Sequence, residues 1–473
     1  MSAEVTRLAS SIAACVNSLR HRLWILYSKL FGTLLHKDAL FTQLHQLFRG
    51  ISGIVTLIMI PLFLTKEQQG YWFTMSSLAA LAMLAELGFF QIALQFAAHE
   101  FAYLRIENNG VVGSEEHRNR LASLFVFCTK WALSVGAVAF PLILVAGFIF
   151  LSQNKTGTTW AIPWIVYVIG SGVTFFNSAL LYFLEGCDLV AIIQRLRLAI
   201  TAATMLIMWL GLVFRFGLHA LSLSMFGGAL YGIWVVWHRY GHLFRNFLAQ
   251  SGSAGHAWGK HILSLLWRYA LSWASGYFIF QIYPLLAFQF RGPVEAGKVG
   301  LSITLWMGIF AVSNSWIYAV TPRLNMFVSR RDRTNMDTLL RKNLFLSAVT
   351  FLAGTLAVFL SMHFMEGRVA LIDRFVDPLS MLFLAVIWFF QIIINGLATY
   401  LRAHKKEPLM LPSVISAIYI TVTTILCARY LDPAYFFLGW LSSCIWGFPW
   451  ILYIFHRKKR EWQATWTHPI PLS

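Results

Sequence analysis

Three charged residues lie inside long apolar segments of the chain: Arg49, Glu86 and Lys130. A charge in the hydrocarbon core of a membrane is costly, so such residues are kept mainly where they bind an ion, a substrate or one another. Each lies about 14 to 16 Å from the predicted cytoplasmic end of its segment, at the rise of an α-helix. We therefore expect the three charges at one level, in the inner half of a membrane.

Two stripes of polar and small residues contain Arg49 and Arg268, one in each half of the chain. The first stripe is Thr42, His45, Gln46, Arg49, Ser52, Gly53 and Thr56, and the second is His261, Ser264, Arg268, Ser272, Ser275 and Gly276. Steps of three and four residues put each stripe on one face of a helix. Because a polar face of a spanning helix must contact protein or water rather than lipid, the stripes predict a shared central cavity.

The charges predict that this cavity binds an anion, with Glu86 as a counter-ion or a site for a proton. The candidate binding residues are Arg49, Lys130, Arg268, Ser52, Thr56, Ser272 and Asn395. Alternatives stay open for several of them. Glu86 could pair with Arg49 only to hold two helices together, Lys130 could extend its amine to the headgroups, and Asn395 could form an ordinary interhelical hydrogen bond.

The composition identifies the elements that must position these residues. Of the 473 residues, 58% are hydrophobic and only 12% are charged, whereas a soluble protein has about 25% charged residues. The same numbers exclude a disordered chain, and the 5 cysteines exclude a disulfide scaffold. The chain is therefore expected to be an all-α polytopic membrane protein, because its apolar segments are continuous runs of the length a spanning helix needs.

Twelve segments can span a membrane. A long cytoplasmic stretch, residues 239–262, divides them into two groups of six. The segments are 40–64, 71–97, 121–151, 161–184, 189–213, 218–238, 263–290, 297–321, 343–365, 378–401, 408–428 and 434–456. The predicted domains are an amphipathic segment 1–39, a six-helix bundle 40–238, a cytoplasmic linker 239–262, a second bundle 263–456 and a basic tail 457–473.

Most of the 37 lysine and arginine residues lie in alternate connecting segments. Positive residues favour the cytoplasmic side, so both termini are predicted to be cytoplasmic. The net charge of +18 is then a topology signal that needs no nucleic-acid partner. Residues 1–37 contain no evident signal peptide. They are predicted to form a basic amphipathic helix on anionic lipid, or else a poorly ordered tail.

Signals for catalysis are missing from the sequence. It contains no P-loop and no dinucleotide-binding fingerprint, and its cysteines lack the spacing of a metal site. His238 and His242 are four residues apart but have no acidic partner nearby. We therefore expect no metal, no cofactor and no enzymatic activity.

Several motifs, in this order, resemble those of lipid-linked oligosaccharide flippases of the O-antigen type. They are Arg49-Gly50, the loop Leu64-Thr-Lys-Glu-Gln-Gln-Gly70, Glu86-Leu-Gly-Phe89, Leu184-Glu-Gly186 and the run from Gly396 to Lys406. These flippases belong to the polysaccharide transporter family, in the multidrug/oligosaccharidyl-lipid/polysaccharide (MOP) superfamily.

The resemblance implies a V-shaped pair of bundles that works by alternating access. The substrate it implies is a polyprenyl-diphosphate-linked sugar for a cell-surface polysaccharide such as lipopolysaccharide, and the partners are membrane lipids and other polysaccharide-assembly proteins. The diphosphate would suit Arg49 and Arg268, and its export could be coupled to an ion gradient.

Two other functions remain open. An exporter of small cations with the same fold should have more acidic than basic residues in its cavity, whereas Arg49, Lys130 and Arg268 outnumber Glu86 here. A membrane-embedded polysaccharide polymerase or ligase should have a catalytic loop or a cluster of His, Asp or Glu at one face. The short outer loops argue against that enzyme.

Overall fold

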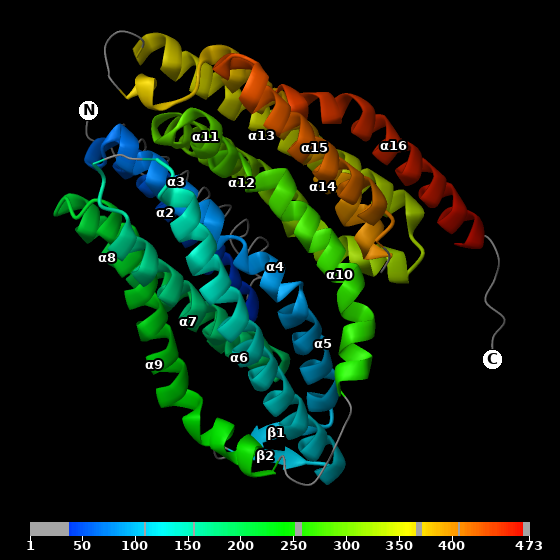
Figure 1. The fold of residues 1–473 in the computed structure, drawn as a ribbon. Coiled ribbons are helices and arrows are strands. Elements are labelled where there is room, and N and C mark those ends of the chain that lie inside the picture. Colours follow the sequence, from blue (N-terminus) through cyan, green and yellow to red (C-terminus); the bar gives the residue numbers. More distant parts are fainter. Residues whose placement is uncertain are drawn as a thin grey trace, which may run out of the picture.

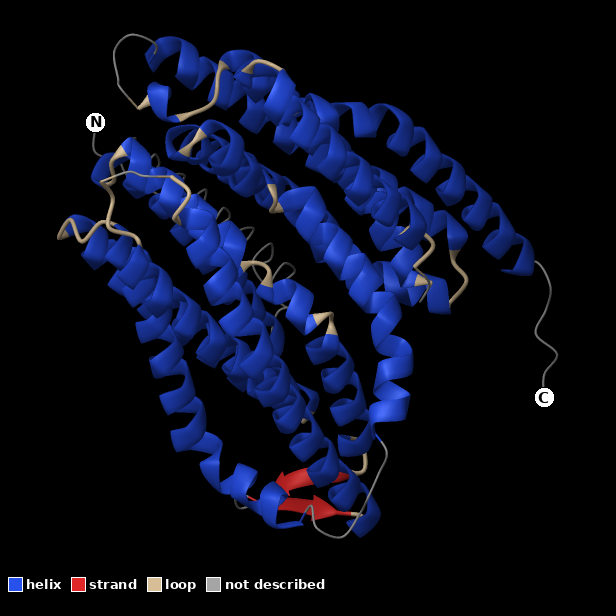
Figure 2. Ribbon diagram, viewed as in Figure 1, coloured by secondary structure: helices blue, strands red, loops and turns tan. Residues whose placement is uncertain are grey.

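A computed structural model describes residues 37–107, 110–154, 157–250, 258–365, 371–404 and 407–466. In these ranges the chain is almost entirely helical, with one short β-hairpin (Figure 1; Figure 2). The amphipathic helix predicted near the N-terminus lies almost wholly outside the described residues. The all-α polytopic architecture is confirmed.

The described residues of the first half form eight helices and the hairpin. They are α2 (Lys37–Phe63), α3 (Lys66–Ala79), α4 (Ala82–Glu86), α5 (Phe89–Phe101), β1 (Leu104–Glu107), β2 (Gly110–Gly113), α6 (Glu115–Leu151), α7 (Ala161–Gly186), α8 (Val190–Val213) and α9 (Leu218–Gln250). β1 and β2 pair antiparallel. We call the end of the molecule with this hairpin the inner end, because the sequence predicts that it is cytoplasmic, and the opposite end the outer end.

In the second half, the part of the chain that the structure describes forms seven α-helices and two short 3-10 helices. They are α10 (Trp258–Phe280), α11 (Tyr283–Arg291), α12 (Pro293–Ser329), α13 (Arg333–Met365), η2 (Ile372–Arg374), α14 (Pro378–Ala403), α15 (Met410–Tyr430), η3 (Pro433–Tyr435) and α16 (Leu438–Trp466). Helices α9 and α10 extend well into the predicted linker 239–262, so only residues 251–257 between them lie outside the description.

Ten of the described helices are long and apolar enough to cross a membrane. The bent pair Lys66–Glu86 and Phe89–Phe101 makes eleven, with an angle of 42° between its two parts. The one predicted segment left over is 263–290, the seventh in chain order. It falls on α10 and α11, which are separated at Gln281 and Ile282. Eleven of the twelve predicted segments therefore correspond to a candidate span, and the seventh to two consecutive helices.

The second segment, predicted as one continuous span, is broken at a defined place. Its first helix, α3, begins with a capping box, in which Thr65 Oγ1 accepts a hydrogen bond from the backbone of Gln68 and Gln68 Oε1 accepts one from the backbone of Thr65. The break before α5 is at Leu87 and Gly88, which both have left-handed backbone conformations, with φ of 52° and 77°. Left-handed residues end an α-helix, so α4 ends at Glu86.

The two halves repeat the same packing. In the first half α2 packs on α8, α5 on α7, and α7 on α9. In the second half the corresponding pairs are α10 on α15, α12 on α14, and α14 on α16. The repeat predicted from the two polar stripes therefore extends to the arrangement of the helices.

The halves meet closely at the outer end, between α3 and α12. A Cβ atom on Gly70 would overlap the carbonyl oxygen of Pro293, and one on Gly300 would overlap the ring of Phe73. Gln69 Nε2 donates a hydrogen bond of 2.8 Å to the carbonyl of Gly297. Only glycine allows the backbones to approach so closely. Toward the inner end the halves diverge except along α10, which stays against α5 and α6, and the end of α16 lies far from the hairpin (Figure 1).

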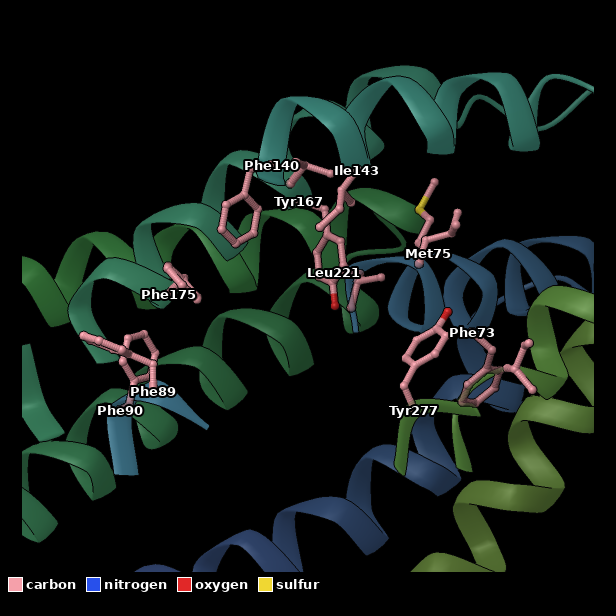
Figure 3. Close-up of a cluster of buried hydrophobic side chains, with 14 of the residues drawn as sticks. Phe73, Met75, Phe89, Phe90, Phe140, Ile143, Tyr167, Phe175, Leu221 and Tyr277 are labelled. Atoms are coloured by element: carbon pink, nitrogen blue, oxygen red, sulfur yellow. The ribbon is translucent and has the colours of Figure 1, made fainter. Parts of the chain in front are cut away.

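One helix of the second half, α10, runs along the whole broken span of the first half. Its inner end starts with Trp258, whose indole donates to Ser123 of α6 and packs edge-on against Phe96 of α5. Its outer part reaches α3, where the Tyr277 hydroxyl donates to the carbonyl of Ser77. Figure 3 shows Tyr277 beside Phe73 in the same region.

Aromatic side chains fill the interior of the first half. Phe90 of α5, Phe140 of α6 and Phe175 of α7 form one cluster (Figure 3), with ring centroids 5.0 Å apart for Phe90–Phe175 and 5.6 Å apart for Phe140–Phe175. Such rings contribute large buried areas and well-defined contacts. The cluster makes the first half a solid body that can move as a unit.

Candidate functional site

Helix α2 has an exposed polar face in the part that contains Arg49. Gln46, Arg49, Gly50 and Gly53 are all exposed and recur at helical spacing; we call them the Arg49 face. A second exposed face is purely apolar: Leu47, Ile51, Ile54, Ile58 and Leu62. A membrane would cover the apolar face with lipid, so the Arg49 face is the part of α2 that needs a polar neighbour.

Ser52 and Thr56 lie on a third face of α2, which packs against α8. Ser52 is 2% exposed, and its hydroxyl donates to the carbonyl of Arg49. Thr56 donates to the carbonyl of Ser52 and accepts a hydrogen bond of 3.0 Å from the Trp209 indole of α8. The described contacts of both hydroxyls are thus with the helices themselves.

Glu86 is the last residue of α4, beside the break in the span, and is half-buried. Among the described residues no ion pair joins Glu86 to Arg49. The alternative in which Glu86 and Arg49 pair only to hold two helices together therefore has no counterpart among the described ion pairs. A carboxylate at a helix C-terminus faces the negative end of the helix dipole, which is an unfavourable place for a negative charge.

Lys130 lies on α6, on a face that it shares with Leu133 and Val138, which are 54% and 62% exposed. Ser134, one turn further along the helix, is also exposed, so the face is mostly but not wholly apolar. The surroundings of Lys130 favour the alternative in which its amine extends toward lipid headgroups.

Arg268 and Ser272 lie on α10, and their side chains are outside the description. Further along the same helix, a Cβ on Gly276 would lie 3.5 Å from the Met83 side chain of α4. This contact places α10 next to the helix that ends at Glu86.

Asn395 of α14 lies in the second half. Its amide donates a hydrogen bond of 2.9 Å to Asn314 Oδ1 of α12, which is fully buried. The described contact of Asn395 is therefore the interhelical bond that the sequence offered as an alternative.

A polar network on α2, α7 and α8 goes beyond what the sequence predicted. Arg197 of α8 pairs with Glu185 of α7 at 2.8 Å, and their side chains are only 22% and 16% exposed. Gln194 donates to Glu185 at 3.1 Å and contacts His45 of α2. Sequence analysis assigned no role to Gln194 or Glu185, although a glutamate near the end of an apolar segment, with glutamine and arginine soon after, was a usable signal.

These residues offer charged and polar groups that can bind a ligand. The described residues contain no group of three His, Cys, Asp or Glu side chains that could hold a metal ion. Arg197 is engaged by Glu185, whereas the exposed Arg49 has no described ion pair. The Arg49 face can therefore offer a positive charge to an incoming anion.

Comparisons with known proteins relate the fold to solved transporters. The sequence matches no family model and none of the curated proteins. The structure is similar to the lipid II flippase MurJ in an inward closed conformation, with a TM-score of 0.62 and 13% identity over 88% of this chain and 87% of that chain.

Two multidrug transporters are also similar in structure. An inward-facing multidrug resistance MATE family transporter of the MOP superfamily has a TM-score of 0.54, with 14% identity over 87% of this chain and 99% of that one. The eukaryotic MATE transporter AtDTX14 has a TM-score of 0.50, with 12% identity over 91% of this chain and 95% of that one. The chain therefore has the fold of the MOP-superfamily transporters, as the resemblance in sequence implied.

Proposed function

We propose that this protein translocates a polyprenyl-diphosphate-linked oligosaccharide across the bacterial inner membrane by alternating access. The observation that carries the proposal is the Arg49 face, an exposed polar strip with a cation in a spanning helix. In the same fold, the structurally similar MurJ is described as a lipid II flippase. The product would serve the assembly of a cell-surface polysaccharide such as an O-antigen.

The charge of the candidate site supports an anionic substrate. The diphosphate would bind at the Arg49 face, with Arg268 as the proposed second cation from the other half. The sugars would occupy the polar space between the halves, and the lipid chain would stay in the bilayer. Glu86 would act as the counter-ion or a proton site that limits how long the diphosphate stays bound.

The arrangement of the halves supports alternating access. They are held together at the outer end by Gly70, Gly297 and Gly300 and diverge toward the inner end. Rigid halves that meet at one end can exchange which end is closed by a hinge movement. An inner-facing state of this kind would accept the substrate where it is made.

The test is translocation in vesicles that contain the purified protein and a lipid-diphosphate-linked oligosaccharide. Wild type should flip the substrate. Arg49→Ala should reduce the rate at least tenfold, since a charge-assisted hydrogen bond contributes about 1.5 to 3 kcal/mol. Lys130→Ala is the comparison variant, because it also removes one cation from a spanning helix but from α6, where the exposed Leu133 and Val138 lie nearby. Equal effects of the two substitutions would contradict the proposed site.

The other functions that the sequence left open are decided in the same vesicles. Efflux of a cationic dye without flipping would favour an exporter of small cations. Transfer or elongation of the sugar chain would identify a polymerase or ligase and would contradict the transporter proposal.

A further inference from the structure

His45 has both ring nitrogens within hydrogen-bond distance of α8. Nδ1 lies 3.2 Å from Gln194 Oε1, and Nε2 lies 3.3 Å from Thr201 Oγ1. The side chain is 8% exposed. A buried histidine whose two nitrogens both face oxygen atoms is in an uncommon position, because a neutral imidazole can donate from only one of them.

Glu185 fixes the orientation of Gln194. An ionised carboxylate accepts hydrogen bonds but donates none, so the amide nitrogen of Gln194 must face Glu185, as it does at 3.1 Å. The amide oxygen is then left for His45. Because that oxygen can only accept, Nδ1 of His45 carries a hydrogen.

Thr201 allows two states for the other nitrogen. Its hydroxyl lies 2.8 Å from the carbonyl of Arg197, one turn back on α8, and donates to it. In that state Thr201 Oγ1 can accept a hydrogen bond from a protonated Nε2. If Nε2 is unprotonated, the hydroxyl can turn and donate to it instead. A proton can therefore bind at Nε2 of His45 when only the Thr201 hydroxyl rotates. The imidazole ring keeps its hydrogen bonds to Gln194 and Thr201 in both states.

The charges around His45 come from each element packed on this part of α2. Arg49 lies one turn further on α2, Arg195 and Arg197 lie on α8, and Glu185 lies on α7. Arg195 stacks on Phe41 with its guanidinium carbon 3.9 Å from the ring centre, and Arg197 is paired with Glu185. Glu86 lies at the end of α4. Arg49 and Arg195 are both exposed, but the guanidinium of Arg195 is stacked on Phe41, so Arg49 is the cation on the polar face of α2 beside His45.

We propose that His45 is a proton-binding site whose charge sets how tightly the Arg49 face holds an anionic headgroup. Residues four apart on a helix are neighbours, so a proton on His45 adds a second positive charge beside Arg49. The added attraction strengthens binding of an anion, and by linkage the bound anion strengthens proton binding equally. This inference rests on the proposed function, because it concerns the same substrate site.

The experiment measures the affinity of the purified full-length protein for prenyl-diphosphate-linked N-acetylglucosamine between about pH 5 and 8, the range in which histidine commonly titrates. The diphosphate diester of this probe stays ionised throughout, so the probe itself does not titrate. Wild type should bind about tenfold more tightly at the acidic end, for a charge added within about 8 Å of the anion. His45→Gln should lose this tenfold change. Because Glu86 is itself a proposed proton site, both proteins are also measured with Glu86→Gln, and in that background His45→Gln should bind with an affinity that does not change with pH.

Two further variants separate proton binding from a structural role. Thr201→Val removes the acceptor for the protonated Nε2 while keeping the shape of the side chain, so the pH dependence should move toward acid by about one pH unit. Thr201→Ser keeps the hydroxyl and should leave the profile in place. Both variants retain His45, so they still test the proposal if His45→Gln does not fold.

The outcomes distinguish the two proposals. Binding that is independent of pH in wild type, or a pH dependence unchanged in both His45→Gln and Thr201→Val, would overturn the role of His45 and leave the proposed function standing. Absence of probe binding by folded wild type at every pH would overturn the proposed function and, with it, this inference.

Discussion

The ion pair between Glu185 and Arg197 shows how much the place of a single contact matters. Both side chains are mostly buried, and the pair also anchors Gln194. Arg105 and Glu107 form a pair of the same length, 2.8 Å, on the hairpin, but their side chains are 74% and 50% exposed. An exposed pair contributes little to stability, whereas breaking a buried one leaves a charge without its partner.

Glu185→Gln should therefore lower the stability of the protein by about 1.5 to 3 kcal/mol, the range for a hydrogen bond to a charged group. The matched control, Glu107→Gln, should cost about 0.5 kcal/mol or less. Thermal unfolding of both variants in the same detergent measures the difference. Equal unfolding temperatures would show that the buried pair has no special role.

At the scale of the helices, the most informative element is the broken second span. Gly88 has a left-handed backbone conformation, which glycine adopts readily and other residues do not. The break ends α4 at Glu86 and starts α5 at Phe89. It thus sets where a half-buried carboxylate lies along the span.

Gly88→Ala should destabilise the protein by about 1 to 2 kcal/mol, because the new Cβ would be strained in the left-handed region. Gly136→Ala in α6 is the control, since a Cβ there would make only ordinary contacts of 3.8 Å and 3.9 Å with Phe175 and Phe140. It should be neutral or stabilise the helix by up to about 1 kcal/mol. Calorimetry of the two variants checks the prediction, and an equally tolerated Gly88→Ala would contradict it.

The close approach of α3 and α12 gives a second prediction at this scale. Gly70→Ala should force the helices apart at the outer end, with a cost of about 1 to 3 kcal/mol for overpacking. A cysteine at position 77, where Ser77 is 2% exposed, should then react faster with a water-soluble thiol reagent. Gly308→Ala is the control, because nothing lies within 4 Å of a Cβ at that position. Unchanged labelling in Gly70→Ala would indicate that the close contact does not hold the outer end shut.

At the scale of the whole molecule, the outer loop between α13 and α14 makes hydrogen bonds to both halves. Gln69 of α3 donates to the carbonyl of Arg374 at 3.3 Å, and Val376 donates its backbone N–H to Ser302 of α12. The loop therefore contacts both the first half and α12. Opening of the outer end requires the Gln69–Arg374 contact to break, whereas the Ser302–Val376 contact can persist.

A bifunctional thiol reagent applied to Gln69→Cys with Arg374→Cys should therefore stop translocation and leave headgroup binding intact. The control pair, Ser302→Cys with Val376→Cys, lies within one half and should not stop translocation. The background needs Cys15→Ser, while the other four cysteines are buried. Translocation that continues with the first pair fully cross-linked would contradict a hinge that opens at the outer end.

The sequence predicted the helical segments and the repeat because both follow from apolar length and spacing. It did not predict the break at Leu87 and Gly88, since the apolar run continues through it and only the backbone conformation marks it. It grouped His45, Ser52 and Thr56 with Arg49 on one polar stripe. In the structure His45, Ser52 and Thr56 lie toward α8, whereas Arg49 is on the exposed face. Which face of α2 is buried depends on where α8 lies, and the polarity of the residues alone does not reveal it. The pairing of Glu185 with Arg197 joins two helices, which spacing within one segment cannot reveal.

The contact of Trp258 with Phe96 and Ser123 also bears on how the protein is made. Chains are synthesised and folded from the N-terminus onward, and residue 258 follows the whole first bundle in the sequence. Until that residue leaves the ribosome, the inner ends of α5 and α6 lack the indole that covers them. The packing of the first bundle is therefore complete only when the start of the second bundle has been synthesised.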